Sequence, residues 1–356
     1  MKIGILTFPN SPSYGATLQM YGLYSTLKEF GCEVEIINYR NTFMTKKKHI
    51  LKHNENFLKK YIFIALDIPS KLKFKKFEKN MTTYPDNIIT EKDNLEIISN
   101  RYDYLICGSD QVWNPFVTGE DLNYFFKFCK ENSKKISYAA SFGVEKLTEE
   151  FSSKVKEELK KFKNISIREK EGAKIIENLL DYECPIVLDP SMLLTQEKWE
   201  KMQKKVKGLP KKYIAKFIFN YDNNVEEKIL ELSKKTKLPV VVIGGTLFSK
   251  FKKGIFTGNI GPTEWLYVLN NAEYVITDSF HGAAFSIIFH KKLYVSLASS
   301  TNSRLKTLLY TFELNDRIIS EKLSFEEIDY QKVQKIMIKK REESLDYLKN
   351  SIRIGE

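Results

Sequence analysis

A histidine in the C-terminal half of the chain is placed to do acid–base chemistry. Residues 274–277 form a strand-like apolar run, Asp278 follows it, and His281 opens a helical run rich in small residues. The positive end of a helix dipole disfavours a protonated imidazole, so the ring of His281 would be neutral and able to accept a proton. We therefore predict that His281 is a catalytic acid or base, with Asp278 beside it. A structural histidine is the alternative.

Two arginines could bind an anionic small molecule. Arg168 follows the short strand-like run 165–167, and a guanidinium group binds carboxylates and phosphates through paired hydrogen bonds. Arg304 lies in a polar segment ahead of a leucine-rich run and is the second candidate. A structural ion pair of Arg168 with Glu169 or Glu171, and a helix-surface role for Arg304, remain as alternatives.

Two polar loops that follow predicted strands suit a hydroxyl-rich ligand. Residues 9–16 lead into a helix, and Gly15 permits close approach of the backbone to a bound group. Residues 108–114 place hydrophilic side chains directly after a buried strand, and Trp113 would supply an apolar face to the ligand. The candidate ligand residues are Tyr14, Gly15, Ser109, Asp110, Gln111 and Asn114. A chain-reversing turn and a capped helix start are the structural alternatives.

The elements that must position these residues repeat a strand–helix rhythm twice. Strand-like runs of the first series lie at residues 3–8, 34–39, 104–107, 136–140, 165–167 and 186–188, and those of the second at 213–219, 240–243, 274–277 and 293–297. Helical segments separate them, which is typical of parallel sheets. We therefore predict an α/β fold of two Rossmann-like domains that face a central cleft, with ligands at the carboxyl ends of the strands.

The domain boundaries follow from this rhythm. We predict an N-terminal domain over residues 1–200 with a basic insertion at about 44–85, and a C-terminal domain over residues 201–322. Residues 323–356 are typical of a charged helix that could pack back on the N-terminal domain. The length of 356 residues agrees with two domains, because single cores stop growing near about 250 residues.

Composition excludes several classes of protein. Hydrophobic residues make up 42% of the chain, which is too many for a disordered protein. The apolar run at the N-terminus is too short for a signal peptide, and no run reaches the roughly 18 apolar residues that cross a bilayer. The four cysteines are far apart and give no zinc or disulfide pattern. We expect a cytoplasmic protein with reduced thiols and no metal site.

The net charge of +12 is unevenly distributed along the chain. Residues 46–79 contain eleven lysines, interleaved with aromatic and aliphatic residues. One interpretation is a solvated helical insertion. The other is contact with an acidic membrane surface or a lipid-diphosphate carrier, which would place the protein peripherally at the inner face of the membrane. Nucleic acid is not an expected partner, because the segment contains no recognisable nucleic-acid-binding module.

Several motifs in a consistent order resemble those of the polysaccharide pyruvyl transferase family. They are Tyr14-Gly15-Ala16, Gly108-Ser109-Asp110-Gln111-Val112-Trp113-Asn114, Tyr138-Ala139-Ala140-Ser141-Phe142-Gly143, Ile167-Arg168-Glu169, Leu188-Asp189-Pro190 and Asp278-Ser279-Phe280-His281-Gly282. The resemblance covers roughly residues 1–320. It implies a GT-B-like fold and an enzyme that transfers the pyruvyl group of phosphoenolpyruvate to a sugar as a cyclic ketal, with release of phosphate.

The resemblance also implies roles for the candidate residues. His281 matches the family's histidine, and Asp278 would orient it or the acceptor. Because phosphoenolpyruvate carries a carboxylate and a phosphate, we expect cations and helix-terminal N–H groups to bind it, without a metal or cofactor. The expected donor ligands are Arg168, which matches the family's post-strand arginine, Ser279, Gly282 and Arg304, and the loop residues named above would bind the acceptor. Many family members carry arginine two residues before this histidine, where the chain has Ser279.

The expected acceptor is a cell-surface glycan such as an exopolysaccharide, or its lipid-linked precursor. Two other functions remain open. The first is a GT-B glycosyltransferase that uses a nucleotide sugar, because one fold serves several chemistries. The second is a non-catalytic glycan-binding or assembly protein.

Overall fold

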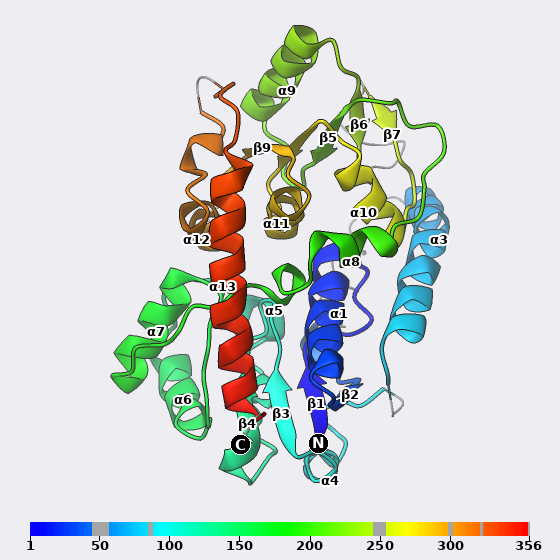
Figure 1. Cartoon of the computed structure of the whole chain (residues 1–356). Helices are drawn as coiled ribbons and strands as arrows, with labels where there is room; N and C mark the ends of the chain where they lie inside the picture. The colour runs from blue at the N-terminus through cyan, green and yellow to red at the C-terminus, as the bar shows by residue number, and fades with distance from the viewer. Residues whose placement is uncertain (45–56, 85–87, 245–253, 298–301, 321–322, 355–356) are drawn as a thin grey trace. The chain divides into compact units, whose positions relative to one another are not determined.

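The structure is a computed structural model that describes residues 1–44, 57–84, 88–244, 254–297, 302–320 and 323–354 (Figure 1). The chain divides into two compact units. Unit 1 comprises Met1–Lys60, Lys75–Leu193 and Lys339–Glu356, and unit 2 comprises Tyr61–Phe74 and Leu194–Ile338. Among the helices in the described ranges, none is long and apolar enough to cross a bilayer.

Unit 1 is built on a parallel sheet with strand order β2-β1-β3-β4. Its strands are β1 (Lys2–Leu6), β2 (Glu33–Ile36), β3 (Tyr104–Cys107) and β4 (Lys135–Ser137). After their first residues, the central strands β1 and β3 are buried throughout, as expected for parallel strands covered on both faces. The predicted strands at 165–167 and 186–188 are reduced to isolated bridges, in which Ile167 pairs with Ala140 and with Ile186.

Two hydrophobic clusters take up alternate side chains of this sheet. Leu105 and Cys107 belong to one cluster and Ile106 to the other, as the two-residue period of a strand requires. The helices of unit 1 are α1 (Tyr14–Glu29), α4 (Leu95–Ser99), α5 (Pro115–Thr118), α6 (Glu149–Leu159), α7 (Lys170–Leu180) and the end of α13 (Tyr330–Ser351). α6 and α7 contribute to the first cluster, and α1 contributes to the second together with Leu348 and Ile352 near the end of α13.

Unit 2 contains a second parallel sheet, with strand order β7-β6-β5-β8-β9. Its strands are β5 (Ile214–Phe217), β6 (Val240–Val242), β7 (Ile255–Phe256), β8 (Tyr274–Thr277) and β9 (Lys292–Val295). Its helices include α8 (Gln196–Lys201), α9 (Asn223–Thr236), α10 (Pro262–Asn270), α11 (Phe280–Ile288) and α12 (Ser303–Thr311). α11 is buried along its whole length and packs against β8, β9, α10 and α12.

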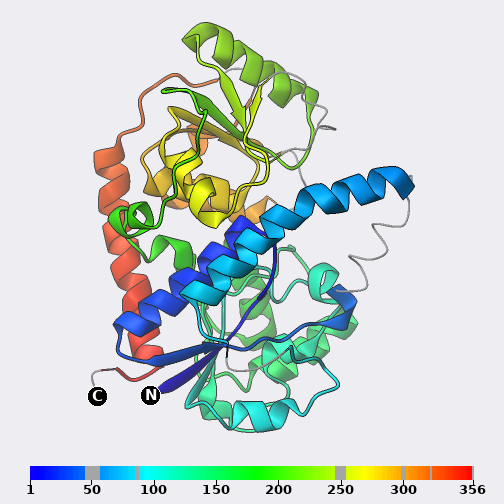
Figure 2. The ribbon, with the colours of Figure 1, turned by 90° about the vertical axis from the view of Figure 1, so that its right-hand side faces the viewer.

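α3 (Phe57–Met81) is one continuous helix of 25 residues (Figure 2). The sequence assigned this segment to an insertion in the N-terminal domain, but the compact units divide it, and Tyr61–Phe74 belongs to unit 2. Within unit 2, the hydroxyl group of Ser70 donates to the carbonyl oxygen of Ile260 at 3.3 Å. Residues 45–56, which contain the first lysines of the insertion, lie outside the described residues.

The prediction of an α/β fold with parallel sheets is confirmed. The strand–helix rhythm was informative because both central sheets are buried, so that their strands appear in the sequence as short apolar runs between helical segments.

Candidate active site

His281 is the second residue of α11, which begins directly after β8. Ser279 caps this helix, and its Oγ accepts a hydrogen bond from the N–H of Gly282 at 3.3 Å. A Cβ atom at Gly282 would lie 2.3 Å from Oγ1 of Thr277, so a larger residue there would push the helix away from β8. His281 keeps 7% of its surface exposed, and its ring packs edge to face on that of Phe280. The strand-to-helix position predicted for His281 is therefore the position that it occupies.

Ser279 and Gly282 are joined by this capping hydrogen bond. The donor-binding role predicted for this pair depended on backbone N–H groups at the helix start, and one of these, that of Gly282, is already engaged by the cap. The cap gives Ser279 a local structural role at the position where many family members carry arginine. Its donor-binding role stays a prediction.

Asp278 fixes a neighbouring loop. One carboxylate oxygen accepts from the N–H of Phe219 at 2.9 Å, and the other accepts from the N–H and the side-chain amide of Asn220 at 2.9 and 3.0 Å. These bonds join the loop after β5 to the loop after β8. Because both oxygens bind this loop, the geometry favours a role for Asp278 in positioning the carboxyl edge of the sheet over the predicted role of orienting His281.

Arg304 is half-buried in the first turn of α12. α12 packs against α11, so Arg304 and His281 belong to neighbouring helices of the same unit. The segment 298–301, which leads from β9 toward α12, lies outside the described residues. Arg304 thus stays a predicted donor ligand.

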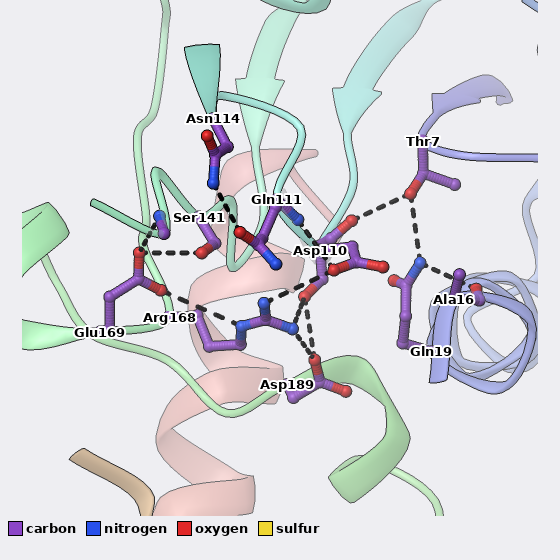
Figure 3. A network of polar contacts seen from close by, with 12 residues as sticks. Thr7, Ala16, Gln19, Asp110, Gln111, Asn114, Ser141, Arg168, Glu169 and Asp189 are labelled. Atoms are coloured by element: carbon purple, nitrogen blue, oxygen red, sulfur yellow. Dashed lines mark hydrogen bonds and ion pairs between the residues drawn. The ribbon is translucent and has the colours of Figure 1, made fainter. Parts of the chain in front are cut away.

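Arg168 lies in unit 1 at the centre of a buried network of charges (Figure 3). Its Nη1 donates to Oδ2 of Asp189 at 2.7 Å and to Oγ of Ser109 at 3.2 Å. Asp110 and Glu169 lie farther from the guanidinium group, with nitrogen–oxygen distances of 3.8 and 4.0 Å. The Arg168 side chain is only 1% exposed. We call these five residues the Arg168 network.

The electrostatics of the Arg168 network keep the arginine charged. Burial alone would lower the pKa of Arg168, but the carboxylates of Asp189, Asp110 and Glu169 together raise it above its ordinary value. The geometry therefore favours the structural ion pair that the sequence left open, with Asp189 as the principal partner in place of Glu169 or Glu171. A guanidinium group that is buried against carboxylates is poorly placed to bind an incoming dianion.

Glu169 holds a second loop to the same network (Figure 3). Its Oε1 accepts hydrogen bonds from the hydroxyl group of Ser141 and from the N–H groups of Phe142 and Gly143. Gly143 has a φ of +61°, and a Cβ atom there would lie 2.3 Å from Oε1 of Gln111. The two consecutive residues Arg168 and Glu169 thus fix the loops that follow β3 and β4.

The residues predicted to bind the acceptor differ in accessibility. Ser109 and Asn114 are buried, and Asn114 caps α5 by accepting from the N–H of Phe116 at 2.9 Å. Asp110 and Gln111 are half-buried, and Asp110 has a φ of +82°, a conformation that costs energy for a residue other than glycine. The strain and the partial exposure make Asp110 and Gln111 the stronger acceptor candidates of this loop.

Tyr14 and Gly15 form the first turn of α1, after the loop that follows β1. Tyr14 is half-buried and Gly15 is buried. Both therefore stay predicted acceptor ligands, at the carboxyl edge of the same sheet as Asp110.

Trp113 is not available to a ligand, in contrast to its predicted role as an apolar binding face. Its indole is fully buried, stacks on the ring of Phe125 at 5.0 Å, and donates to the carbonyl oxygen of Tyr124. Local sequence patterns do not predict this burial, because α5 lies between Trp113 and the two residues that it contacts.

Sequence reasoning assigned no role to Asp189, although it lies in one of the motifs. Besides binding Arg168, its second carboxylate oxygen accepts from the N–H and the hydroxyl group of Ser191, at 3.0 and 2.7 Å. An aspartate that follows a strand-like run and precedes proline is typical of a capped turn, and this pattern could have marked it as an anchor.

A shallow depression of about 690 Å³ in unit 1 lies apart from the predicted site residues. Five carboxylates line it, against two lysines: Glu91, Asp93, Glu96, Glu120, Asp121, Lys127 and Lys130. The excess of negative charge would repel phosphoenolpyruvate, so this depression is not a candidate donor site.

The candidate residues belong to two different compact units. His281, Asp278, Ser279, Gly282 and Arg304 lie in unit 2. Arg168 and the predicted acceptor residues lie in unit 1. Within each unit, these residues are at or just after the carboxyl ends of strands, as ligand sites of parallel sheets are.

Structural comparison defines the fold as GT-B-like. The UDP-GlcNAc 2-epimerase from Methanocaldococcus jannaschii matches with a TM-score of 0.55 and 12% sequence identity, over 95% of this chain and 92% of that chain. A Listeria monocytogenes protein assigned as a UDP-N-acetylglucosamine 2-epimerase matches with a TM-score of 0.52 and 10% identity, over 98% and 90% of the two chains. At this level of identity, the likeness concerns the fold alone.

The chain belongs to the polysaccharide pyruvyl transferase family, because the family model "Polysaccharide pyruvyl transferase" matches residues 14–298. It is therefore a transferase, and the resemblance inferred from the motifs is confirmed. A search of curated protein sequences finds no significant match.

Proposed function

We propose that the protein transfers the pyruvyl group of phosphoenolpyruvate to two hydroxyl groups of a sugar, forming a ketal and releasing phosphate. The observation that carries this proposal is the family match, which extends over residues 14–298 and includes the motif of His281. The sugar would be part of a cell-surface glycan or of its lipid-linked precursor. The reaction needs no cofactor, and the proposal requires no metal.

The proposed reaction places specific demands on proton transfer. One sugar hydroxyl adds to C2 of phosphoenolpyruvate while the C3 methylene gains a proton and becomes a methyl group. The bond from C2 to the phosphate oxygen then breaks, the second hydroxyl adds to C2, and its proton leaves with the phosphate. One group must therefore give a proton to carbon and recover one from a hydroxyl near neutral pH, which suits an imidazole with an ordinary pKa of about 6.5.

His281 would be this acid–base group. Its place at the start of α11, directly after β8, puts it at the carboxyl edge of the unit 2 sheet, where a small anion can also interact with the helix N-terminus. Arg304, on the neighbouring helix α12, would supply a cation for the donor carboxylate or phosphate. Asp110 and Gln111 of unit 1 would bind acceptor hydroxyl groups.

Arg168 would act as a positioning residue. Its ion pair with Asp189 and its hydrogen bond to Ser109 hold the residue that precedes Asp110, and its own charge lies near the carboxylate of Asp110. In this role it would shape the acceptor loop without touching the donor.

A phosphate-release screen tests the proposed function. The full chain would be incubated with phosphoenolpyruvate and a panel of free and lipid-linked glycans, and released phosphate would be measured. We expect release only in the presence of a glycan that offers two neighbouring hydroxyl groups, with a product heavier by the mass of the pyruvyl ketal.

Two results would replace the proposal with another function. A rise in melting temperature with nucleotide sugars but not with phosphoenolpyruvate would favour a glycosyltransferase. Binding of glycans with no phosphate release across the panel would favour a non-catalytic glycan-binding or assembly protein.

A further inference from the structure

The two sides of α3 differ in burial and charge. Ile68 and Leu72 are 47% and 61% exposed, and the lysines that follow on the same side are exposed as well. At about 100° per residue, these residues fall within an arc of about 100° around the helix. They are Ile68, Leu72, Lys75, Lys76 and Lys79, and we call them the α3 outer face.

The opposite side of α3 is occupied by contacts with the rest of the protein. Phe74, Phe77 and Glu78 are buried, and the ring of Phe77 lies 5.8 Å from that of Tyr21. Lys73 donates to the carbonyl oxygen of Asn259 and pairs with Glu264 at 3.3 Å, where a second lysine, Lys204, also approaches. Within each unit, these contacts fall on the side of the helix opposite to the outer face.

All charged side chains of the α3 outer face are positively charged. From residue 68 to the end of α3 at Met81, the only carboxylate is that of Glu78, and it is 2% exposed. In the described structure, Lys75, Lys76 and Lys79 form no ion pair. Two exposed aliphatic side chains therefore share one side of the helix with three lysines that form no ion pair among the described residues.

We propose that the α3 outer face binds the surface of an anionic membrane. Aliphatic side chains at such a surface enter the boundary between headgroups and acyl chains, while neighbouring lysines interact with anionic lipids. A nucleic acid would use the lysines but would leave Ile68 and Leu72 in water, so the combination favours a bilayer over a polyanion.

The buried side of α3 links the proposed membrane contact to the candidate acceptor loop through hydrogen bonds of Glu78. Glu78 accepts hydrogen bonds from the N–H of Asn10 at 2.9 Å and from the hydroxyl group of Thr17. Asn10 belongs to the loop that leads to Tyr14 and Gly15. A membrane-bound α3 would thus hold this loop near lipid-linked glycans, if the proposed function is correct, whereas the membrane contact itself does not depend on the reaction.

Vesicle flotation with the full chain tests the proposal. We expect binding to phosphatidylcholine vesicles that contain about 30% phosphatidylglycerol, and little binding to phosphatidylcholine alone. Replacing Lys75, Lys76 and Lys79 by Gln should lower partitioning on the order of 100-fold, at about fivefold per lysine. Ile68→Ser combined with Leu72→Ser should lower it roughly tenfold while leaving the salt dependence in place.

α13 provides a matched control. It carries exposed Lys332, Lys335 and Lys339 and an exposed Ile338, but Glu342 and Glu343 follow on the same helix. Replacing its three lysines by Gln changes the net charge by the same amount and should leave vesicle binding within about twofold of the wild type if α3 is the contact.

Three outcomes would overturn the proposal. They are absence of wild-type binding to the anionic vesicles, equal losses from the α3 and α13 lysine variants, and unchanged binding after both α3 substitutions. Tighter binding to a single-stranded nucleic acid than to the vesicles would instead assign the surface to a polyanion. Phosphate release with a soluble glycan is measured without vesicles, so failure of the membrane contact and failure of the proposed reaction are distinguishable.

Discussion

The carboxyl edges of the two sheets differ in what their charged side chains contact. In unit 1, the Arg168 cation is buried together with the carboxylates of Asp189 and Glu169, and the remaining hydrogen bonds of these residues fix adjacent loops. In unit 2, Asp278 is half-buried and accepts its hydrogen bonds from a neighbouring loop, and His281 lies three residues away at a helix start.

This difference indicates that the buried charges of unit 1 hold the structure together, whereas His281 of unit 2 is the candidate for the chemical step. A buried cluster of compensating charges tolerates little change, because removal of one member leaves the others unpaired in a medium of low dielectric. His281 belongs to the other unit and lies outside the Arg168 network. We therefore expect substitutions in unit 1 to reduce stability first, and substitution of His281 to reduce turnover in a folded protein.

The largest effect should come from Arg168→Met. The substitution leaves the carboxylates of Asp189 and Glu169 buried without their cation, which typically costs about 3–5 kcal/mol of unfolding free energy. Urea denaturation measures the loss, and Arg101→Met removes an exposed arginine from the same unit as a control. If Arg168→Met kept its stability and lost only phosphoenolpyruvate binding, Arg168 would be a donor ligand, and the comparison would fail.

The sequence identified Arg168 but could not identify its partners. Asp189 is 21 residues away and Ser109 is 59 residues away, and both come near only through the order and register of the parallel strands. Glu169 and Glu171 were the natural candidates because they are near in sequence. Local sequence patterns thus predicted that Arg168 is an important residue, whereas the tertiary structure determines which carboxylate it pairs with.

The second effect is on catalysis. His281→Gln keeps a polar side chain of similar size but removes the acid–base group, so we expect kcat for phosphate release to fall about 10²-fold or more. The melting temperature should change little. His290→Gln is the matched control, because His290 is exposed just after the end of the same helix, with its Nε2 3.3 Å from Gln334. Equal activity of the two variants would remove His281 from the mechanism.

The fold was more predictable than the site because burial leaves a clear signal in a strand. Both central sheets appeared as apolar runs, and the helix starts at Tyr14 and Phe280 followed them closely. The division of α3 between the units was not predictable, because it depends on contacts such as that of Lys73 with Asn259, 186 residues away. The burial of Trp113 was not predictable either, because it depends on packing against Phe125 and Phe142, which local sequence patterns do not show.

A smaller effect should come from Gly282→Ala, which tests whether close packing sets the position of His281. The new methyl group would meet Oγ1 of Thr277 at 2.3 Å, and forced overpacking typically costs 1–3 kcal/mol, here about 2 kcal/mol. The cost should not depend on salt, because it comes from steric overlap between uncharged groups. Combination with Thr277→Ala should cost less than the sum of the two single substitutions, as measured by a double-mutant cycle. Additive costs would show that the contact is relieved without strain.

The smallest effect concerns Glu78, a buried carboxylate of unit 1 outside the Arg168 network. Burial raises its pKa above the ordinary value, although hydrogen bonds from Tyr84, Asn10 and Thr17 and the charge of Arg40 act in the opposite direction. A raised pKa in the folded state means that the contribution of this group to stability is fully present below the pKa of the unfolded chain. It is lost as the pH rises through the folded-state pKa.

Glu78→Gln removes this titration and keeps a side chain of the same shape. The melting temperature of the variant, relative to the wild type, should therefore increase from about pH 4 to pH 7, by a few degrees at most. Glu145→Gln, at an exposed position, should show no such trend. A relative stability of Glu78→Gln that fell toward pH 7 would mean that the ionised carboxylate is favoured by its partners, as in the Arg168 network. Charge compensation in unit 1 would then extend to the β1–α1 loop, because Glu78 holds that loop through the N–H of Asn10.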